Sequence, residues 1–156
     1  MLRISRLTDY ATVILASLGG GSLASAADIA ERTHIGVPTV SKLLKELQHA
    51  GLVKSVRGAR GGYQLARPAT GISAADIIDA VEGPVALTEC ATGSGMCGIQ
   101  TTCTVGHGWQ GISQAIRHAL IGISLTDLVS RAGEFPIPEL RRPATRVQHS
   151  AKTSRP

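Results

Sequence analysis

The stretch that most limits how this chain can fold is residues 37–65, where a helical pattern runs directly into a glycine-rich hairpin pattern. Four apolar residues in the first part share one helical face: Val40, Leu43, Leu44 and Leu47. Pro38 suits the first helical position, because its missing amide hydrogen would have no partner there, and Gly51 ends the pattern. These residues predict an amphipathic helix with one buried face.

Two further helices are predicted before this one. The first ends at the sequence GGGS and has four apolar residues at helical spacing: Leu7, Ala11, Ile14 and Leu18. The second begins at Ser25, with Asp28 three residues on as its capping-box partner, and turns Ile29 and Ala30 inward. The sequence THIG at residues 33–36 then supplies a turn. The order is helix, turn, helix.

A β-hairpin is predicted directly after Gly51. Apolar residues alternate on the two sides of its turn: Leu52, Val53, Val56, Tyr63 and Leu65. Three glycines in the connection permit positive φ angles: Gly58, Gly61 and Gly62. A hairpin that follows a helix-turn-helix is the wing of a winged-helix DNA-binding domain. We therefore expect a mainly α fold with one small β-hairpin.

The charge distribution favours DNA as the partner of this region. Residues 42–67 contain six Lys or Arg and only one acid, Glu46, whereas residues 70–140 contain two basic and seven acidic residues. The formal net charge of +5 comes from the last 16 residues, which have five Lys or Arg and no acid. A helix-turn-helix shape also occurs in proteins that do not bind DNA, but together with this charge pattern it favours DNA binding.

The second helix of the motif is expected to enter the major groove. Thr39, Ser41 and Lys42 would lie nearest the bases, and Lys45 would lie nearer a phosphate. The arginines of the wing, Arg57 and Arg60, would contact the adjacent minor groove or the backbone.

All three cysteines of the chain, Cys90, Cys97 and Cys103, fall within one glycine-rich run that cannot build a core. The sequence shows no signal-peptide pattern and no apolar stretch of roughly 18 residues, so we expect a cytoplasmic protein without a membrane partner. Structural disulfides are rare in a reducing compartment, and three is an odd number. Metal binding or redox chemistry is therefore favoured.

The sequence predicts four regions. Residues 1–83 are expected to form the winged helix-turn-helix, including a further helix that starts at Ser73, and residues 84–106 form the cysteine-containing loop. Residues 107–133 would contain a long apolar helix around Trp109, interpreted as a C-terminal dimerisation helix, and a short helix capped by Ser124. Residues 134–156 form a basic tail that lacks apolar periodicity and is expected to be disordered.

Several motifs resemble one known family. The sequences RISRLTDYA, RGARGGYQLARP and ISAADIIDAVEGP, followed by three cysteines before a long helix, resemble the iron-sulfur-sensing winged-helix regulators of the IscR and NsrR group. The resemblance extends from residue 1 to about residue 133, and LTDYATVILASL is most like the subgroup that regulates SUF-type cluster assembly. It implies a homodimeric transcription factor on palindromic operator DNA, with one iron-sulfur cluster per subunit bound by Cys90, Cys97 and Cys103.

A fourth ligand for the cluster remains open between two residues. His107 follows Cys103 by four positions, and Asp9 matches the acidic position that NsrR-like members use across the dimer. Six residues separate Cys90 from Cys97 where IscR-like members have five, and MCGIQTTC is closer to the NsrR pattern. The cluster type, [2Fe-2S] or [4Fe-4S], stays undecided. Ser41 stands where some IscR-like members have an operator-discriminating glutamate.

Other functions compete with cluster sensing. Zinc could use the same thiolates with His107, and a thiol-redox switch would need no metal, so a zinc-stabilised, redox-switched or nitric-oxide-responsive repressor is the alternative. An enzyme is not expected, because the sequence has no evident nucleophile–base pair or phosphate-cradling loop.

Overall fold

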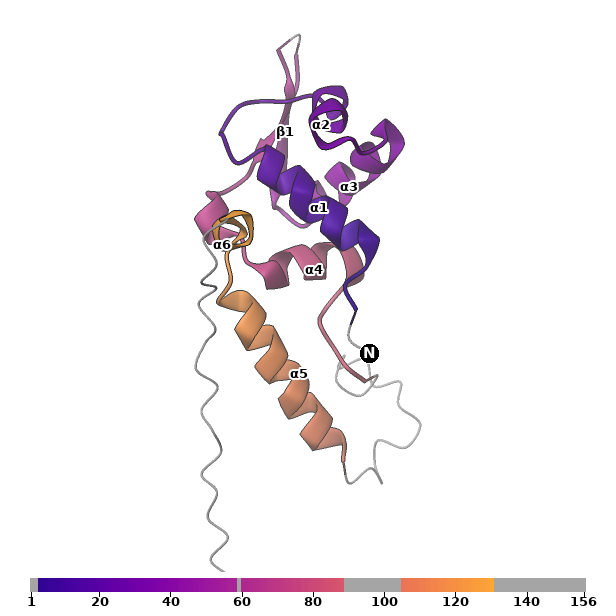
Figure 1. Ribbon diagram of the computed structural model, residues 1–156, viewed down its shortest axis with the longest axis vertical. Coiled ribbons are helices and arrows are strands. Elements are labelled where there is room, and N and C mark those ends of the chain that lie inside the picture. Colours follow the sequence, from indigo (N-terminus) through magenta and orange to yellow (C-terminus); the bar gives the residue numbers. More distant parts are fainter. Residues whose placement is uncertain (1–2, 59, 89–104, 131–156) are drawn as a thin grey trace, which may run out of the picture.

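The computed structural model describes residues 3–58, 60–88 and 105–130, and their order of elements is that of a winged helix followed by two further helices. Helices α1 (Arg6–Ser17), α2 (Ala26–Thr33) and α3 (Val37–His49) precede the strands β1 (Val53–Val56) and β2 (Gly62–Leu65). A 3-10 turn, η1 (Ala69–Gly71), leads to α4 (Ala74–Glu82), and α5 (Gly106–Ile121) and α6 (Leu125–Val129) complete the described elements. The predicted fold class, mainly α with one hairpin, is confirmed (Figure 1).

The helix-turn-helix forms from local signals. The Ser25 side chain accepts a hydrogen bond from the Asp28 amide, and the Asp28 carboxylate accepts one from the Ser25 amide, so the predicted capping box is present. His34 ends α2 in the left-handed region, with φ of 57°. Helix α3 begins at Val37, so Pro38 is the second helical residue and lies one position later than predicted.

The wing is a two-stranded antiparallel hairpin whose register runs from Val53 opposite Leu65 to Val56 opposite Gly62. Its second strand also binds the loop before α2. The Ala24 amide donates to the Tyr63 carbonyl at 3.1 Å, and the Tyr63 amide donates to the Ala24 carbonyl at 2.8 Å. A Cβ on Gly62 would lie 2.7 Å from the Ala24 carbonyl oxygen, so this close approach requires a glycine.

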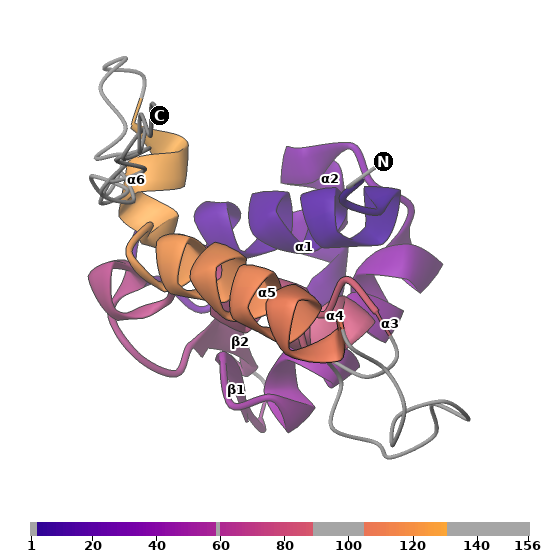
Figure 2. The same ribbon diagram turned by 90° about the horizontal axis from the view of Figure 1, so that it is seen from below.

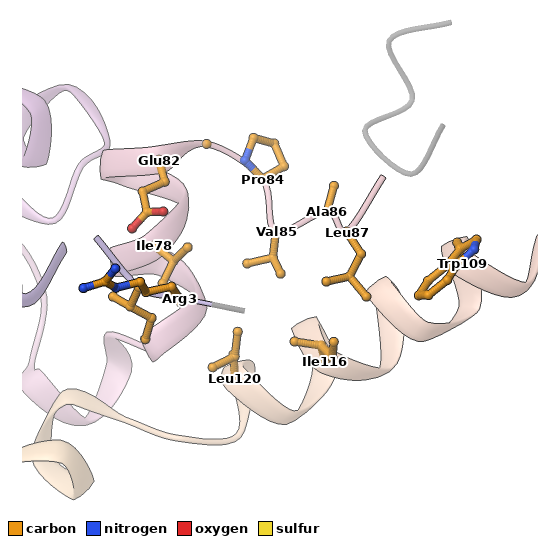
Figure 3. Close-up of a pocket in the computed structure, with 12 residues that line it drawn as sticks. Arg3, Ile78, Glu82, Pro84, Val85, Ala86, Leu87, Trp109, Ile116 and Leu120 are labelled. Carbon is orange, nitrogen blue, oxygen red and sulfur yellow. The ribbon is translucent and has the colours of Figure 1, made fainter. Parts of the chain in front are cut away.

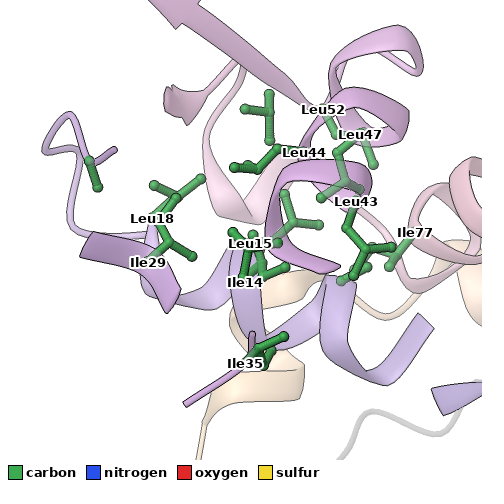
Figure 4. Close-up of a cluster of buried hydrophobic side chains, with 14 of the residues drawn as sticks. Ile14, Leu15, Leu18, Ile29, Ile35, Leu43, Leu44, Leu47, Leu52 and Ile77 are labelled. Atoms are coloured by element: carbon green, nitrogen blue, oxygen red, sulfur yellow. The ribbon is translucent and has the colours of Figure 1, made fainter. Parts of the chain in front are cut away.

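The hydrophobic core lies between α1, α2, α3 and α4 (Figure 4). The predicted α3 stripe is fully buried, and other large buried side chains join it: Ile14, Leu15, Leu18, Ile29, Leu52, Ile72 and Ile77. Leu7 is an exception to the predicted pattern, because it is 37% exposed. Thr8 takes the inward position instead and is only 3% exposed.

The last two helices lie in different surroundings. Helix α5 runs along the underside of the body and contacts α4 (Figures 1 and 2). Helix α6 returns to the winged-helix body, where it packs on α1 and η1 and buries Leu125. Two backbone hydrogen bonds fix this return, from the Leu125 amide to the Ile72 carbonyl at 2.7 Å and from the Ala74 amide to the Ile123 carbonyl at 2.8 Å. The core of the body thus includes residues well beyond position 83.

No helix within the three described ranges is long and apolar enough to cross a membrane.

Candidate functional site

The outward face of α3 holds the predicted base-reading residues. Because the inward positions are taken by the buried stripe, Lys42 and Lys45 are exposed, and Thr39 and Ser41 are half-buried. The Lys42 ammonium lies 3.9 Å from a carboxylate oxygen of Glu46, an exposed i,i+4 pair that holds the side chain only weakly. Lys42 therefore remains available for another anion.

The first turn of α3 adds apolar surface that sequence reasoning missed. Val37 is 47% exposed and Pro38 is also exposed. The first residues of a recognition helix meet the base edges, and apolar side chains there suit the thymine methyl group. The signal was present in the sequence, since neither residue belongs to the buried stripe.

The wing presents its two predicted arginines to solvent. Arg57 and Arg60 are both exposed, and the hairpin projects beyond the helical body (Figure 1). The end of α3 is joined to the first strand by a hydrogen bond of 3.2 Å, which the side-chain amide of Gln48 donates through Nε2 to the Ser55 hydroxyl. The wing and the recognition helix are therefore held together as one surface.

The predicted metal ligands are only partly visible. Cys90, Cys97 and Cys103 lie outside the described residues, and within those residues no three His, Cys, Asp or Glu side chains form a group that could hold a metal. Asp9 is exposed in the first turn of α1, and His107 is exposed in the first turn of α5. Within the described part of the chain neither side chain makes a hydrogen bond or ion pair, and carboxylates and imidazoles are donor types that metal ions accept.

A carboxylate that the sequence analysis did not single out joins α4 to α1. Glu82, the last residue of α4, accepts a hydrogen bond from the Ser5 amide at 3.0 Å and another from the Thr8 hydroxyl. The hydrogen bond from Thr8, and then that from Ser5, hold the pKa of Glu82 below its ordinary value of 4.5, against a smaller opposing effect of burial. No local pattern could have revealed this contact, because Glu82 and Thr8 are 74 positions apart.

Two contacts hold α5 beside α4 and the segment that follows it. The Arg117 guanidinium lies 2.6 Å from the Asp79 carboxylate, and the Leu87 amide donates to the Ser113 hydroxyl at 3.1 Å. Between these elements lies an apolar groove of about 640 Å³ (Figure 3). Its apolar lining comes from the chain before α1, from α4, from the 84–88 segment and from α5: Ile4, Ile78, Pro84, Val85, Ala86, Leu87, Trp109, Ile116 and Leu120.

Helix α5 also presents apolar residues to solvent. Val105 at its N-terminus is 60% exposed, Trp109 is 44% exposed and Ile112 is 46% exposed. The spacing of four and then three residues, which Ile116 continues, places them on one side of the helix. An apolar stripe of this kind is typical of a helix that packs against another helix.

The comparisons with known proteins agree with this geometry. The family described as "Rrf2: Iron-dependent Transcriptional regulator" matches residues 4–131. A putative HTH-type transcriptional regulator, ORF2, of Azotobacter vinelandii is 42% identical over 108 residues, which cover 69% of this chain and 65% of that protein. The HTH-type transcriptional regulator IscR of Cereibacter sphaeroides is 33% identical over 135 residues, covering 82% of this chain and 87% of that protein.

Solved structures show the same architecture. CymR, the global cysteine regulator of B. subtilis, has a TM-score of 0.64 and 32% identity, covering 82% of this chain and 96% of that chain. The T. potens IscR has a TM-score of 0.58 and 33% identity, covering 81% of this chain and 85% of that chain.

Proposed function

Because the chain belongs to the Rrf2 family of transcriptional regulators, we propose that it senses an iron-sulfur cluster and binds palindromic operator DNA as a homodimer. The proposed genes are those of SUF-type cluster assembly, on the strength of the sequence LTDYATVILASL. The chain would act as a cytoplasmic regulator and not as an enzyme. The observation that supports DNA binding most directly is the exposed basic face of α3 beside an arginine-bearing wing.

Binding would begin with the phosphate backbone. Lys45 and the wing arginines Arg57 and Arg60 would contact phosphates or the minor groove, and these contacts fix the position of the body on the duplex. Thr39, Ser41 and Lys42 would then face the base edges, with Val37 at the start of the helix against an apolar part of the groove. Ser41 offers one short hydroxyl, so it imposes little base preference by itself.

The second copy of the chain would pack on α5. The exposed stripe of Val105, Trp109 and Ile112 is continuous with the half-buried Ile116 and Leu120 of the groove. Burying this surface in a helix pair would remove apolar area from water and set the two recognition helices at a fixed separation. This separation is what a palindromic operator requires.

The cluster would be held by Cys90, Cys97 and Cys103. Thiolates are the soft ligands that iron-sulfur clusters use, and either Asp9 or His107 could supply the fourth donor, since both are exposed. When bound, the cluster would supply an iron centre that oxidation or loss of iron can change. The runner-up, a zinc-stabilised or thiol-switched repressor, would use the same cysteines.

Anaerobic purification tests the proposal. Protein that senses a cluster should be brown, contain iron and acid-labile sulfide, and lose its visible absorption when any one of the three cysteines is replaced by alanine. Its affinity for operator DNA should differ between cluster-loaded and cluster-free forms. Colourless protein with one zinc per chain, whose affinity for operator DNA does not change after an attempt to load a cluster, would reject cluster sensing in favour of the runner-up.

A further inference from the structure

The carboxylate of Glu82 holds the first turn of α1. It accepts from the amide of Ser5, which caps this helix, and from the hydroxyl of Thr8, which is 3% exposed. The amides of Thr8 and Asp9 in turn donate to Ser5, at 3.2 Å each. A negative charge at a helix N-terminus is also favoured by the helix dipole. The position of Asp9 therefore depends on a residue of a different helix.

The same residue lies just before the cysteine segment, which is the cysteine-containing loop predicted at residues 84–106. Glu82 ends α4, and Gly83 then turns the chain with φ of 88° into the 84–88 segment that leads to the first cysteine. This segment is bonded to α5, the helix that follows the last cysteine, through Leu87 and Ser113. A shift of the cysteine segment against α5 would thus pull on the end of α4.

We propose that Glu82 is the positioning residue through which the state of the cysteine segment reaches the DNA-binding body. Its hydrogen bonds to Ser5 and Thr8 convert a movement at the end of α4 into a movement of the first turn of α1. Helix α1 packs against α2 and α3, so this movement reaches the recognition helix. This role rests on the proposed function, because it requires that the cysteine segment changes state.

Three variants and one matched control test the role. Glu82→Ala removes both acceptors, Glu82→Gln keeps an acceptor oxygen in the same place, and Thr8→Val removes the hydroxyl donor with little change of shape. Asp28→Ala is the control, because it removes a carboxylate with the same kind of bonds to Ser25 at the start of α2.

The first measurement is the ratio of operator affinities of cluster-loaded and cluster-free protein. Coupling between two sites commonly amounts to about 5- to 150-fold. In Glu82→Ala this ratio should fall to within about twofold of one. In Thr8→Val it should lie between one and the wild-type value, and in Glu82→Gln and Asp28→Ala it should stay close to the wild-type value. The visible absorption per chain gives the cluster content, and the ratio is compared between proteins with equal cluster content. If Glu82→Ala kept the wild-type ratio, or if Asp28→Ala lost it equally, the proposal would be overturned.

The second measurement needs no cluster. Amide hydrogen exchange of Thr8 and Asp9 in cluster-free protein should become about tenfold faster or more in Glu82→Ala, because hydrogen bonds to a charged group are among the stronger ones. Unchanged exchange rates in Glu82→Ala would mean that the hydrogen bonds to Glu82 do not hold the first turn of α1. Wild-type protein without any cluster would instead reject the proposed function and, with it, the signalling role of Glu82, while the exchange result would still decide whether Glu82 holds α1. If Glu82→Ala does not fold, Thr8→Val and Glu82→Gln decide both measurements.

Discussion

Arg117 and Asp79 form an ion pair that joins α5 to α4, with one guanidinium nitrogen 2.7 Å from one carboxylate oxygen and 2.6 Å from the other. Both side chains are partly exposed, so the pair is expected to contribute up to about 1 kcal/mol to the free energy of unfolding. Urea unfolding of Arg117→Ala, Asp79→Asn and the double variant measures this coupling as a double-mutant cycle. A coupling of zero would mean that this ion pair does not contribute to holding α5 against α4.

Leu125 should be as important to stability as the residues of the α3 stripe. It is 1% exposed and packs in the same core as Leu44, although it comes from the short helix after α5. Leu125→Ala should lower the free energy of unfolding by about 2–5 kcal/mol, as Leu44→Ala should. Leu128→Ala, at a position that is 37% exposed, is the matched control and should cost much less. If Leu125→Ala lowered the free energy of unfolding as little as Leu128→Ala, α6 would not belong to the core.

Gly62 should not tolerate a side chain. An added Cβ would lie 2.7 Å from the Ala24 carbonyl oxygen and would separate the wing from the loop before α2. We expect Gly62→Ala to destabilise the protein by about 1–3 kcal/mol, as overpacking does, and to weaken DNA binding because the wing is displaced. Gly71→Ala, where no atom lies within 4 Å of the added Cβ, is the control for thermal unfolding.

The basic face of α3 and the wing should determine the salt dependence of DNA binding. Lys45→Ala and Arg57→Ala should each weaken operator binding and reduce the slope of log affinity against log salt by about one unit, because each removes one phosphate contact. Deleting residues 143–156 should reduce only the affinity for non-operator DNA. Fluorescence anisotropy at several salt concentrations measures both effects. Loss of operator recognition on deletion of the tail alone would place the reading surface elsewhere.

Stability should fall in acid because of the helix caps. Hydrogen bonds from the side chain and backbone of Ser25 lower the pKa of Asp28 below 3.8, and those from Ser124 do the same for Asp127. A carboxylate whose pKa is lower in the folded state contributes stability that is present above the pKa of the unfolded chain and is lost as the pH falls through the folded value. The free energy of unfolding should therefore decrease below about pH 4. In a variant with Asp28→Ala and Asp127→Ala, this part of the decrease should be missing.

The parts of the fold that sequence reasoning predicted are those set by neighbours in the chain. The capping box of Ser25 and Asp28 and the buried stripe of α3 depend on residues three or four positions apart, and all of them are confirmed. Thr8 was beyond reach, because the partner that accepts its hydroxyl hydrogen at this buried position is Glu82, which lies 74 positions away in the sequence. The burial of Leu125 could not be predicted either, because the core residues that it packs with lie far from it in the sequence.

The candidate site also has a part that the sequence predicted and a part that only the structure shows. The exposure of Lys42, Lys45 and the wing arginines followed from the helical and hairpin periods, and the same helical period also left Val37 outside the buried stripe. The groove beside α5 needed the packed structure, because its lining comes from segments far apart in the chain. The ligand roles of the cysteines, Asp9 and His107 stay predictions, as do the base contacts.

The return of α6 to the body has a consequence for how such a protein can be recombined. The strand-like contact between Ser73 and Ser124 and the buried Leu125 mean that the chain leaves the body after α4 and comes back to complete it. A fragment cut after residue 83 would lack a core side chain. An exchange of residues 84–122 would keep Leu125 in that core, so a different segment could be introduced there as an insertion and not as a C-terminal fusion.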